Sequence, residues 1–526
     1  MIIEREVIIF PDDINDLDKI KSEIIFQTQT KINDFTGYTI LKRSIDARGR
    51  HIMYRLKVAV YINQNPVFEV NNVAYQNVSK SKRVIVVGAG PAGLFAALRL
   101  IELGLKPIII ERGKNVQDRR RDLAALNKQG LVNPNSNYCF GEGGAGTYSD
   151  GKLYTRSNKR GDVNKMLQIL VNHGATPDIM VDARPHIGTN KLPQIIVNIR
   201  ESVLNYGGEI HFDTKLTDLN IVSNTFKSVV TNKGTMEGEA LILATGHSAK
   251  DIYQLLRKKG ILLEAKPFAL GVRIEHPQYI IDQLQYHCEV RHSNLPPSNY
   301  SLVQQVGGRG VFSFCMCPGG IIAPCATNDG EIVVNGWSPS KRNNPYANSG
   351  TVVQVNLNDV SGDNSNAFKL LDFQTQIEQN AFTAGGGGLK APAQRMVDFV
   401  NHKTSVTLPQ NSYLPGLTSS NLHDILPPFV ANSLKAALPL FGNKMKGRFG
   451  NDGYYTNEAV LVGVESRTSS PIRIPRDKET LQHPQIKGFF PCAEGAGYAG
   501  GIISAAIDGQ ACADGVFRFL GYHYCF

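Results

Sequence analysis

The sequence predicts an α/β protein in three parts, organised around a doubly wound, mostly parallel sheet. An apolar strand runs straight into a glycine-rich turn and a helix over residues 84–103. A second apolar strand, 240–244, ends in small residues, and an apolar helix opened by glycines closes the chain at 502–519. With 526 residues, the chain exceeds the usual size of a single hydrophobic core, so several domains are expected.

The predicted parts are a small N-terminal α+β domain at 1–80 and the first piece of the sheet domain at 81–260. An inserted mixed α+β domain follows at 261–455, and the C-terminal piece of the sheet domain spans 456–526. The main domain is therefore expected to be discontinuous, because the chain leaves it for the insertion and returns at its end.

Composition favours an ordinary globular protein, with 42% hydrophobic and 19% charged residues. The net charge of +10 is one that a nucleic-acid partner can explain. The basic residues are dispersed, however, with only short clusters such as Arg119–Arg121. A basic surface that attracts anionic small molecules is the favoured interpretation, and a nucleic-acid partner is disfavoured.

Cysteine use and the absence of targeting signals predict a cytoplasmic protein. The eight cysteines show no disulfide-like framework. The first residues lack the basic-then-apolar layout of a signal peptide, and no apolar run reaches the length of a membrane span.

Residues before 80 predict a helix on a short sheet. Strands are expected at Glu4–Phe10, Thr39–Ser44 and His51–Ile62, and a helix at Asp13–Phe26. Charged residues cluster in the loop from Arg43 to Arg50. A solvated turn or a docking surface is favoured there over an anion site.

The turn after strand 84–87 predicts a dinucleotide site. Its Gly-x-Gly-x-x-Gly pattern leads into a helix at 94–103 and a second strand at 106–110 that ends in an acidic residue. The first glycine permits the tight turn, the second lets the backbone approach a pyrophosphate, and the third lets helix and strand pack closely. The predicted contacts are Gly88, Gly90, Pro91, Ala92, Gly93, Glu111 and Arg112, with Glu111 as acceptor for a ribose. The alternative is a glycine turn in a sheet without a cofactor.

A second glycine-rich loop follows a charged helix at 115–130. Four glycines within six residues exclude a stable helix or strand and let backbone N–H groups converge on an anion or a ring edge. The residues predicted to contact the ligand are Gly141, Gly143, Gly144, Ala145, Gly146, Thr147 and Lys152. A flexible surface loop is the alternative.

The chain then alternates helices and strands. Helices are expected at Val163–His173 and Leu192–Tyr206, a strand at Glu209–Lys215 and a meander over Leu219–Glu237. The next strand, 240–244, ends in Ala244, Thr245 and Gly246, small residues that can approach a cofactor. His247 follows; a capping or surface role is favoured over proton transfer.

The insertion is predicted to be rich in strands. They are expected at Phe268–Glu275, Ser301–Val306, Gly310–Met316 and Gly330–Trp337, with helices at Leu370–Phe382 and Leu434–Leu440. Trp337, the single tryptophan, is expected to serve packing.

Together these features resemble the FAD-binding domain of glutathione-reductase-like flavoproteins, a discontinuous Rossmann-like domain of the second glutathione-reductase type. The segments 140–153, 312–320, 465–471 and 492–502 resemble, more narrowly, the bacterial family of uncharacterised FAD-dependent dehydrogenases. The resemblance spans nearly the whole chain and implies FAD as resident cofactor, but it implies no particular substrate.

The resemblance also assigns roles to the C-terminal turn. Glu494, followed by Gly495, would accept hydrogen bonds from the ribityl chain. Gly500, Gly501 and Ile502 would place a helix N-terminus near the flavin's pyrimidine edge, where its positive dipole end stabilises the negative charge of reduced flavin.

Three residues are candidates for catalysis: Cys315, Cys317 and Arg467. On a strand, both cysteines would point to the same face, where they can line the flavin; two buried core thiols are the favoured alternative. Arg467 can bind a substrate carboxylate or phosphate, or form an internal ion pair, with equal weight. No metal site is predicted, because the spacing of Cys325 and His292 fits no common zinc site.

The predicted function is hydride transfer between FAD and a small organic substrate, between the loop 141–146 and the strand 312–320. A monooxygenase or double-bond reductase that uses NAD(P)H is an alternative. No second glycine fingerprint follows a clean strand, so NAD(P)H or another electron carrier would bind only transiently. A flavin-containing RNA-modifying or RNA-binding protein is the alternative from another class.

Overall fold

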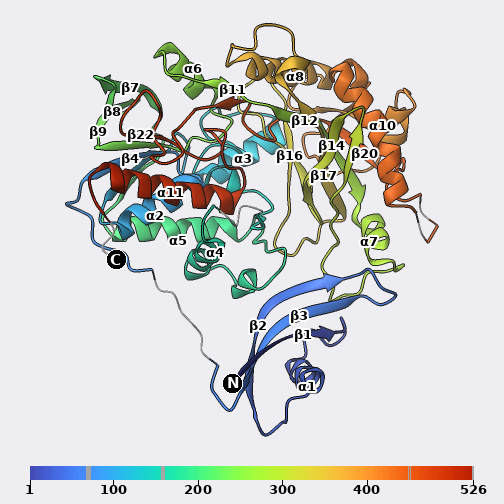
Figure 1. Ribbon diagram of the computed structural model, residues 1–526. Coiled ribbons are helices and arrows are strands. Elements are labelled where there is room, and N and C mark those ends of the chain that lie inside the picture. Colours follow the sequence, from blue (N-terminus) through green and yellow to red (C-terminus); the bar gives the residue numbers. More distant parts are fainter. Residues whose placement is uncertain (67–72, 156–159, 448, 451, 524–526) are drawn as a thin grey trace.

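The computed structural model has three parts: the main sheet domain, which contains the long helix α11 (Ile502–Phe519), the insertion and the N-terminal domain (Figure 1). The structure describes residues 1–66, 73–155, 160–447, 449–450 and 452–523. Within these residues, no helix is both long and apolar enough to cross a membrane.

The main sheet has five parallel strands, in the order β22-β10-β4-β5-β6. They are β22 (Phe489–Pro491), β10 (Ala240–Leu243), β4 (Arg83–Val87), β5 (Lys106–Ile110) and β6 (Glu209–His211). Because β22 comes from the end of the chain and pairs with β10, the predicted discontinuous α/β domain is confirmed.

The two faces of this sheet are covered differently, and the alternation of side chains along β4 decides which residues face which layer. Val84 and Val86 pack in a core with the helices α2 (Pro91–Glu102), α5 (Leu192–Asn205) and α11, which lie side by side in Figure 1. Ile85 and Val87 pack against the three-stranded meander on the other face. The meander consists of β7 (Leu216–Val222), β8 (Thr225–Thr231) and β9 (Gly234–Glu237).

The remaining helices of this domain are α3 (Val116–Gln129), α4 (Val163–Asn172) and α6 (Lys250–Lys258). Asn115 caps α3 by accepting from the N–H groups of Gln117 and Asp118, and Gly130 ends it in the left-handed conformation. The sequence predicted α3 to within a residue at each end. It gave no prediction for α6, whose apolar residues are few.

The insertion is built on a seven-stranded sheet, in the order β13-β14-β17-β12-β20-β18-β19. Its strands are β12 (Phe268–Pro277), β13 (Val303–Val306), β14 (Arg309–Cys317), β17 (Tyr346–Val355), β18 (Ala391–Arg395), β19 (Leu417–Ser419) and β20 (Val460–Glu465). Helices α7 (Gln278–Tyr286), α8 (Lys369–Gly385), α9 (Met396–Val400) and α10 (Pro428–Lys444) pack around it. Two-stranded sheets are formed by β15 (Ile321–Pro324) with β16 (Val334–Trp337), and by β11 (Glu264–Ala265) with β21 (Ile472–Arg473).

Two predictions for the insertion are corrected by this sheet. Its predicted end at 455 is too early, because β20 pairs with both β12 and β18. The helix predicted at 434–440 is longer, because α10 begins at Pro428 and continues past Pro439 to Lys444.

The N-terminal domain is the antiparallel sheet β1-β3-β2 with helix α1 packed on it. The strands are β1 (Ile2–Ile9), β2 (Phe35–Asp46) and β3 (Met53–Ile62), and the helix is α1 (Leu17–Thr28). Figure 1 shows this domain below the rest of the molecule. It docks through Arg43, whose guanidinium contacts Asp182 at 2.7 Å and Asp178 at 3.1 Å. Arg43 lies in β2 and not in the predicted loop, and the docking interpretation of the Arg43–Arg50 cluster is confirmed for this residue.

Candidate functional site

A cavity of about 310 Å³ lies where the main sheet domain meets the insertion. Its walls come from the β4–α2 turn, the glycine-rich loop, the end of β10, the C-terminal turn and the strands β14 and β16. Most of the surface is apolar side chain and backbone, with a few polar groups, as is typical of cofactor and substrate sites.

The turn between β4 and α2 has the geometry that its glycines predicted. Gly88 has φ +105°, and a Cβ there would lie 2.4 Å from the carbonyl oxygen of Ala244. A Cβ on Gly93 would lie 1.9 Å from the carbonyl oxygen of Gly88. Gly90 differs, because the nearest atom to its Cβ would be 3.9 Å away, at Gly144. Gly90 therefore keeps open space in the cavity, while Gly88 and Gly93 permit close packing.

Glu111 is buried and joins three segments. Its Oε2 accepts from the N–H of Ala89, and its Oε1 accepts from the N–H groups of Gly113 and Gly141. A carboxylate has about four lone-pair sites, so one acceptor position is left for a ribose hydroxyl. Glu111 lines the cavity, and its role as a ribose acceptor stays a prediction.

The glycine-rich loop is held in shape by Arg119, which the sequence had placed in a basic surface cluster. That placement is wrong: Arg119 is fully buried. Its guanidinium donates to the carbonyl oxygens of Asn137, Tyr138, Glu142 and Gly144. Burial lowers the pKa of Arg119, and nearby Tyr148 and Glu111 oppose this effect. A helix residue thus fixes the loop that follows the helix, and the loop is no flexible surface segment.

Two helix N-termini meet at the cavity. Gly146 lies between them, since a Cβ there would be 3.1 Å from Pro91 at the start of α2 and 3.5 Å from Ile502 at the start of α11. The two helices also pack closely, because a Cβ on Gly509 would lie 2.1 Å from the carbonyl oxygen of Ala92. Helix N-termini favour negative charge, so a ligand with a pyrophosphate and an anionic ring edge fits this arrangement.

The C-terminal turn brings Glu494 beside His247, with 3.3 Å between Oε2 and Nδ1. Both residues line the cavity. Gly495 lies against Gly246, so the turn after β10 and the turn after β22 are in direct contact. His247, for which a capping or surface role was favoured, is a partner of Glu494.

Most of the predicted cofactor contacts line the cavity. They are Gly88, Gly90, Pro91, Ala92, Glu111, Arg112, Gly144, Ala145, Gly146, Lys152, Ala244, Thr245, Gly246, Glu494, Gly501 and Ile502. Those that do not line it are Gly93, Gly141, Gly143, Thr147, Gly495 and Gly500. The second group shapes the walls: Thr147 donates to the carbonyl oxygen of Glu142, and Gly500 lies against the carboxylate of Glu494.

Cys315 and Cys317 both line the cavity, but not for the predicted reason. Cys315 has φ +44°, and the register of β14 shifts between Phe314 and Cys317, so regular alternation fails there. Cys315 is exposed to the cavity, whereas Cys317 is buried. The thiol of Cys317 donates to the carbonyl oxygen of Cys315 at 3.3 Å. The bulge thus gives the two thiols different surroundings.

Arg467 lies in an internal ion-pair network. Its guanidinium contacts Glu378 at 2.9 Å and Glu331 at 3.2 Å, and Lys250 contacts the same two carboxylates. Arg467 also donates to Thr327. These contacts favour the internal ion pair over a substrate-binding role, although Arg467 forms part of the cavity wall.

The structure adds residues that sequence reasoning did not place in the site. Trp337 lines the cavity together with Tyr138, Phe140, Tyr148, Asp150, Phe314 and Glu465. Arg273, wholly buried in β12, lies behind the wall and contacts four of its residues. An arginine within the otherwise apolar residues 268–274 of β12 was the available signal.

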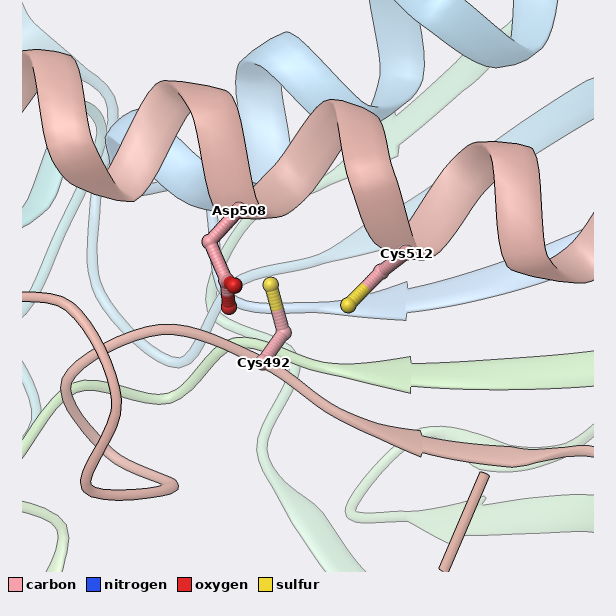
Figure 2. Close-up of side chains that lie close together, drawn as sticks. All are labelled: Cys492, Asp508 and Cys512. Atoms are coloured by element: carbon pink, nitrogen blue, oxygen red, sulfur yellow. The ribbon is translucent and has the colours of Figure 1, made fainter. Parts of the chain in front are cut away.

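Figure 2 shows a second cluster, in which Cys492, Asp508 and Cys512 point toward one another between the C-terminal turn and α11. Both carboxylate oxygens of Asp508 are bound by Arg476, at 2.6 and 2.9 Å. Asp508 also accepts from the N–H of Ala493. The negative charge of Asp508 is therefore met by an arginine, and the cluster holds the turn before Glu494 against the helix.

The fold and the site define a dinucleotide-binding protein of the flavoprotein type, and the comparisons specify it. Residues 83–119 match a profile described as an FAD binding domain, and 267–468 match one described as FAD-dependent protein, C-terminal domain-like. Residues 1–61 match a domain of unknown function (DUF8436). An uncharacterised protein of Clostridium beijerinckii is 38% identical over 96% of this chain and 96% of its own.

The chain belongs to this family of FAD-dependent proteins, and FAD is its cofactor. The match at 267–468 includes β20, the last strand of the seven-stranded sheet along the chain. Similar solved structures include a glycine oxidase from Geobacillus kaustophilus, 12% identical with TM-score 0.36 over 85% of this chain and 97% of that one. Another is a flavocytochrome c3 fumarate reductase, 12% identical with TM-score 0.34 over 84% and 79%. Scores this low carry no argument about this chain.

Proposed function

We propose that the protein is an FAD-dependent dehydrogenase that transfers a hydride between its flavin and a small organic substrate bound in the cavity. The observation that carries the proposal is the make-up of the cavity. One side is the nucleotide-binding turns and the other is the insertion, with β14 and β16 facing the glycine-rich loop. A resident cofactor and a second molecule can therefore share one cavity.

The residues present fit FAD. The open space at Gly90 and the N-terminus of α2 would take the pyrophosphate, and Glu111 would accept from the adenosine ribose. Glu494 would accept from the ribityl chain, and the N-terminus of α11 would face the flavin ring. When bound, FAD supplies hydride transfer, and the protein contributes binding and orientation.

The monooxygenase and double-bond reductase are alternatives on the same scaffold, and oxygen-dependent NAD(P)H consumption would favour the monooxygenase. The RNA-binding alternative has less support, because the basic loop near Arg43 is engaged in ion pairs: Arg43 with Asp178 and Asp182, Arg48 with Asp46.

Anaerobic titration of the purified FAD-loaded protein against a metabolite panel tests the proposal. The panel includes NADH and NADPH, and flavin absorbance reports reduction. We expect at least one organic metabolite to bleach the flavin without a nicotinamide. Bleaching by NAD(P)H alone, followed by rapid reoxidation in air, would replace the dehydrogenase with the monooxygenase. A matched Gly90→Ala protein, which fills the open space at the turn, should retain the fold and hold little flavin.

A further inference from the structure

One corner of the cavity brings an acidic side chain, a basic side chain and a thiol together. Asp150 and Lys152 come from the glycine-rich loop, and Cys315 comes from the bulge of β14. The Nζ of Lys152 lies 3.8 Å from Oδ2 of Asp150 and 3.9 Å from the sulfur of Cys317, and it donates to the carbonyl oxygen of Met316. We call Asp150, Lys152 and Cys315 the polar corner.

Asp150 provides a hydrogen-bond acceptor in the cavity wall. It is 4% exposed and lines the cavity. Its Oδ2 is bound by Arg342 at 3.0 Å, whereas Oδ1 has no hydrogen-bond partner among the described residues. An unpartnered buried carboxylate oxygen is costly unless a donor completes it. Burial would raise the pKa of Asp150, but Lys152 and Arg342 hold it below its ordinary value, so the group is an ionised acceptor.

The cysteine of the corner is held from behind by Arg273. The guanidinium donates to the carbonyl oxygen of Cys315 at 2.8 Å and contacts the sulfur of Cys317 at 3.5 Å. Its remaining donors bind Asn348, Asn335 and Glu465, so all five N–H groups are used. The backbone of Cys315 is consequently held in place, and Cys315 lines the cavity.

Cys315 is a neutral hydrogen-bonding thiol. Desolvation by the surrounding protein raises the pKa of this thiol to about 11. Lys152 and Arg273 lower the pKa of this thiol, and Cys317 and Glu465 raise it.

On the insertion side, Glu465 and Arg467 form part of the cavity wall, and the charge of each is met by buried partners. Glu465 is bound to Arg273, and Arg467 is bound to Glu378 and Glu331. Toward the cavity, this side presents apolar groups, among them Phe314, Val333 and Trp337. Within the described residues, the wall thus offers little to a charged substrate.

We propose that the polar corner is the substrate subsite and that it takes the hydroxyl group of an otherwise apolar, uncharged alcohol. The inference rests on the proposed function, whose substrate class it names. A hydroxyl donates to the free oxygen of Asp150 and accepts from Lys152 or the Cys315 thiol. The corner holds both signs of charge, so a carboxylate attracted by Lys152 also meets the Asp150 carboxylate, and an ammonium group attracted by Asp150 also meets Lys152 and Arg342. A hydroxyl can use the donor and the acceptor without either repulsion.

The test uses three probes with the same ring: benzyl alcohol, benzoate and benzylamine. Each is added to the FAD-loaded protein during alkylation by iodoacetamide at about pH 8.5, where enough thiolate forms to react. Peptide mass spectrometry follows Cys315, with half-buried Cys288, which packs with the N-terminal domain, as internal control. Flavin absorbance is recorded in parallel.

We expect benzyl alcohol to protect Cys315 at a concentration about tenfold lower than either charged probe, the effect of one hydrogen bond to a charged group. Cys288 should react equally with all three. In Asp150→Asn the preference for the alcohol should fall below about twofold. Equal protection by the three probes, or none by benzyl alcohol, would overturn the subsite, and this comparison stands if the variant fails to fold.

Protection needs no turnover, so the two proposals fail separately. A protein that prefers benzyl alcohol but whose flavin no metabolite bleaches keeps the subsite and loses the proposed hydride transfer. A protein whose flavin is bleached only by organic anions, without preference for benzyl alcohol, keeps hydride transfer and loses the subsite.

Discussion

The two walls of the cavity are built by opposite means. On the nucleotide side, glycines and backbone groups shape the surface, and Gly88, Gly93 and Gly146 allow segments to approach within contact distance. On the insertion side, buried ion pairs support the wall: Glu465 and Arg467 line the cavity, and Arg273 and Glu378 pair with them from behind. The first wall requires positions without a side chain, and the second requires ion-pair partners from segments distant in the sequence.

Removing one partner of a charge pair should have the largest effect on stability. Arg273→Met leaves Glu465 buried without its partner, so we expect a loss of about 3–5 kcal/mol in the free energy of unfolding. Arg121→Met, which changes an 82% exposed side chain, is the control and should stay within about 0.5 kcal/mol. Urea denaturation measures both. Equal stability of the two variants would remove the distinction between the walls.

The pH dependence of stability should also belong to the insertion. Burial raises the pKa of Glu275 to about 7 and lowers that of its neighbour His276 to about 4. Glu275 therefore contributes stability that is full below about pH 4.5 and lost as the pH rises toward 7; His276 contributes stability that is full above about pH 6.5 and lost as the pH falls toward 4.

The contributions of Glu275 and His276 change with pH in opposite directions. Glu275→Gln removes the first, so the pH dependence that remains should be that of His276. Relative to the native protein, this variant should gain up to about 3 kcal/mol between pH 4.5 and 7. Urea denaturation at a series of pH values measures the difference. A difference that does not change with pH would contradict the assignment of this carboxyl.

Two glycines of the nucleotide wall should differ in their effects, and the expected changes in stability are smaller. Gly93→Ala places a Cβ 1.9 Å from the carbonyl oxygen of Gly88, so the protein should lose about 1–3 kcal/mol of stability. Gly90→Ala places its Cβ in open space, so stability without FAD should be nearly unchanged while FAD affinity falls. Thermal unfolding and FAD titration separate the effects. Loss of stability in Gly90→Ala, with affinity retained, would show that the open space has no role in binding.

The smallest expected effect lies outside both walls, at the docked N-terminal domain. Arg43→Ala removes partly exposed ion pairs to Asp178 and Asp182, which are worth about 0–1 kcal/mol. The free energy of unfolding should change within that range, and FAD content should not change. A large loss of FAD would mean that the domain contributes to the cofactor site.

The contrast also explains how much the sequence alone could predict. The nucleotide wall uses local signals: Gly88 to Gly93, Glu111, and the closing helix, which matched its predicted bounds. Arg119 was misplaced because a helix position does not reveal a buried partner. The insertion wall depends on pairing between segments far apart, such as β12 with β20, whose partners are nearly 200 residues apart. The bulge at Cys315 likewise follows from tertiary contacts, and alternation along a strand cannot predict it.

A crystal structure of the FAD-loaded protein tests the central claim most directly. We expect the pyrophosphate at Gly90 and the N-terminus of α2, and the flavin ring beside the N-terminus of α11, with the space toward Cys315 and Asp150 left for a substrate. A flavin ring outside the cavity, or one that fills the polar corner itself, would contradict a cavity shared by cofactor and substrate.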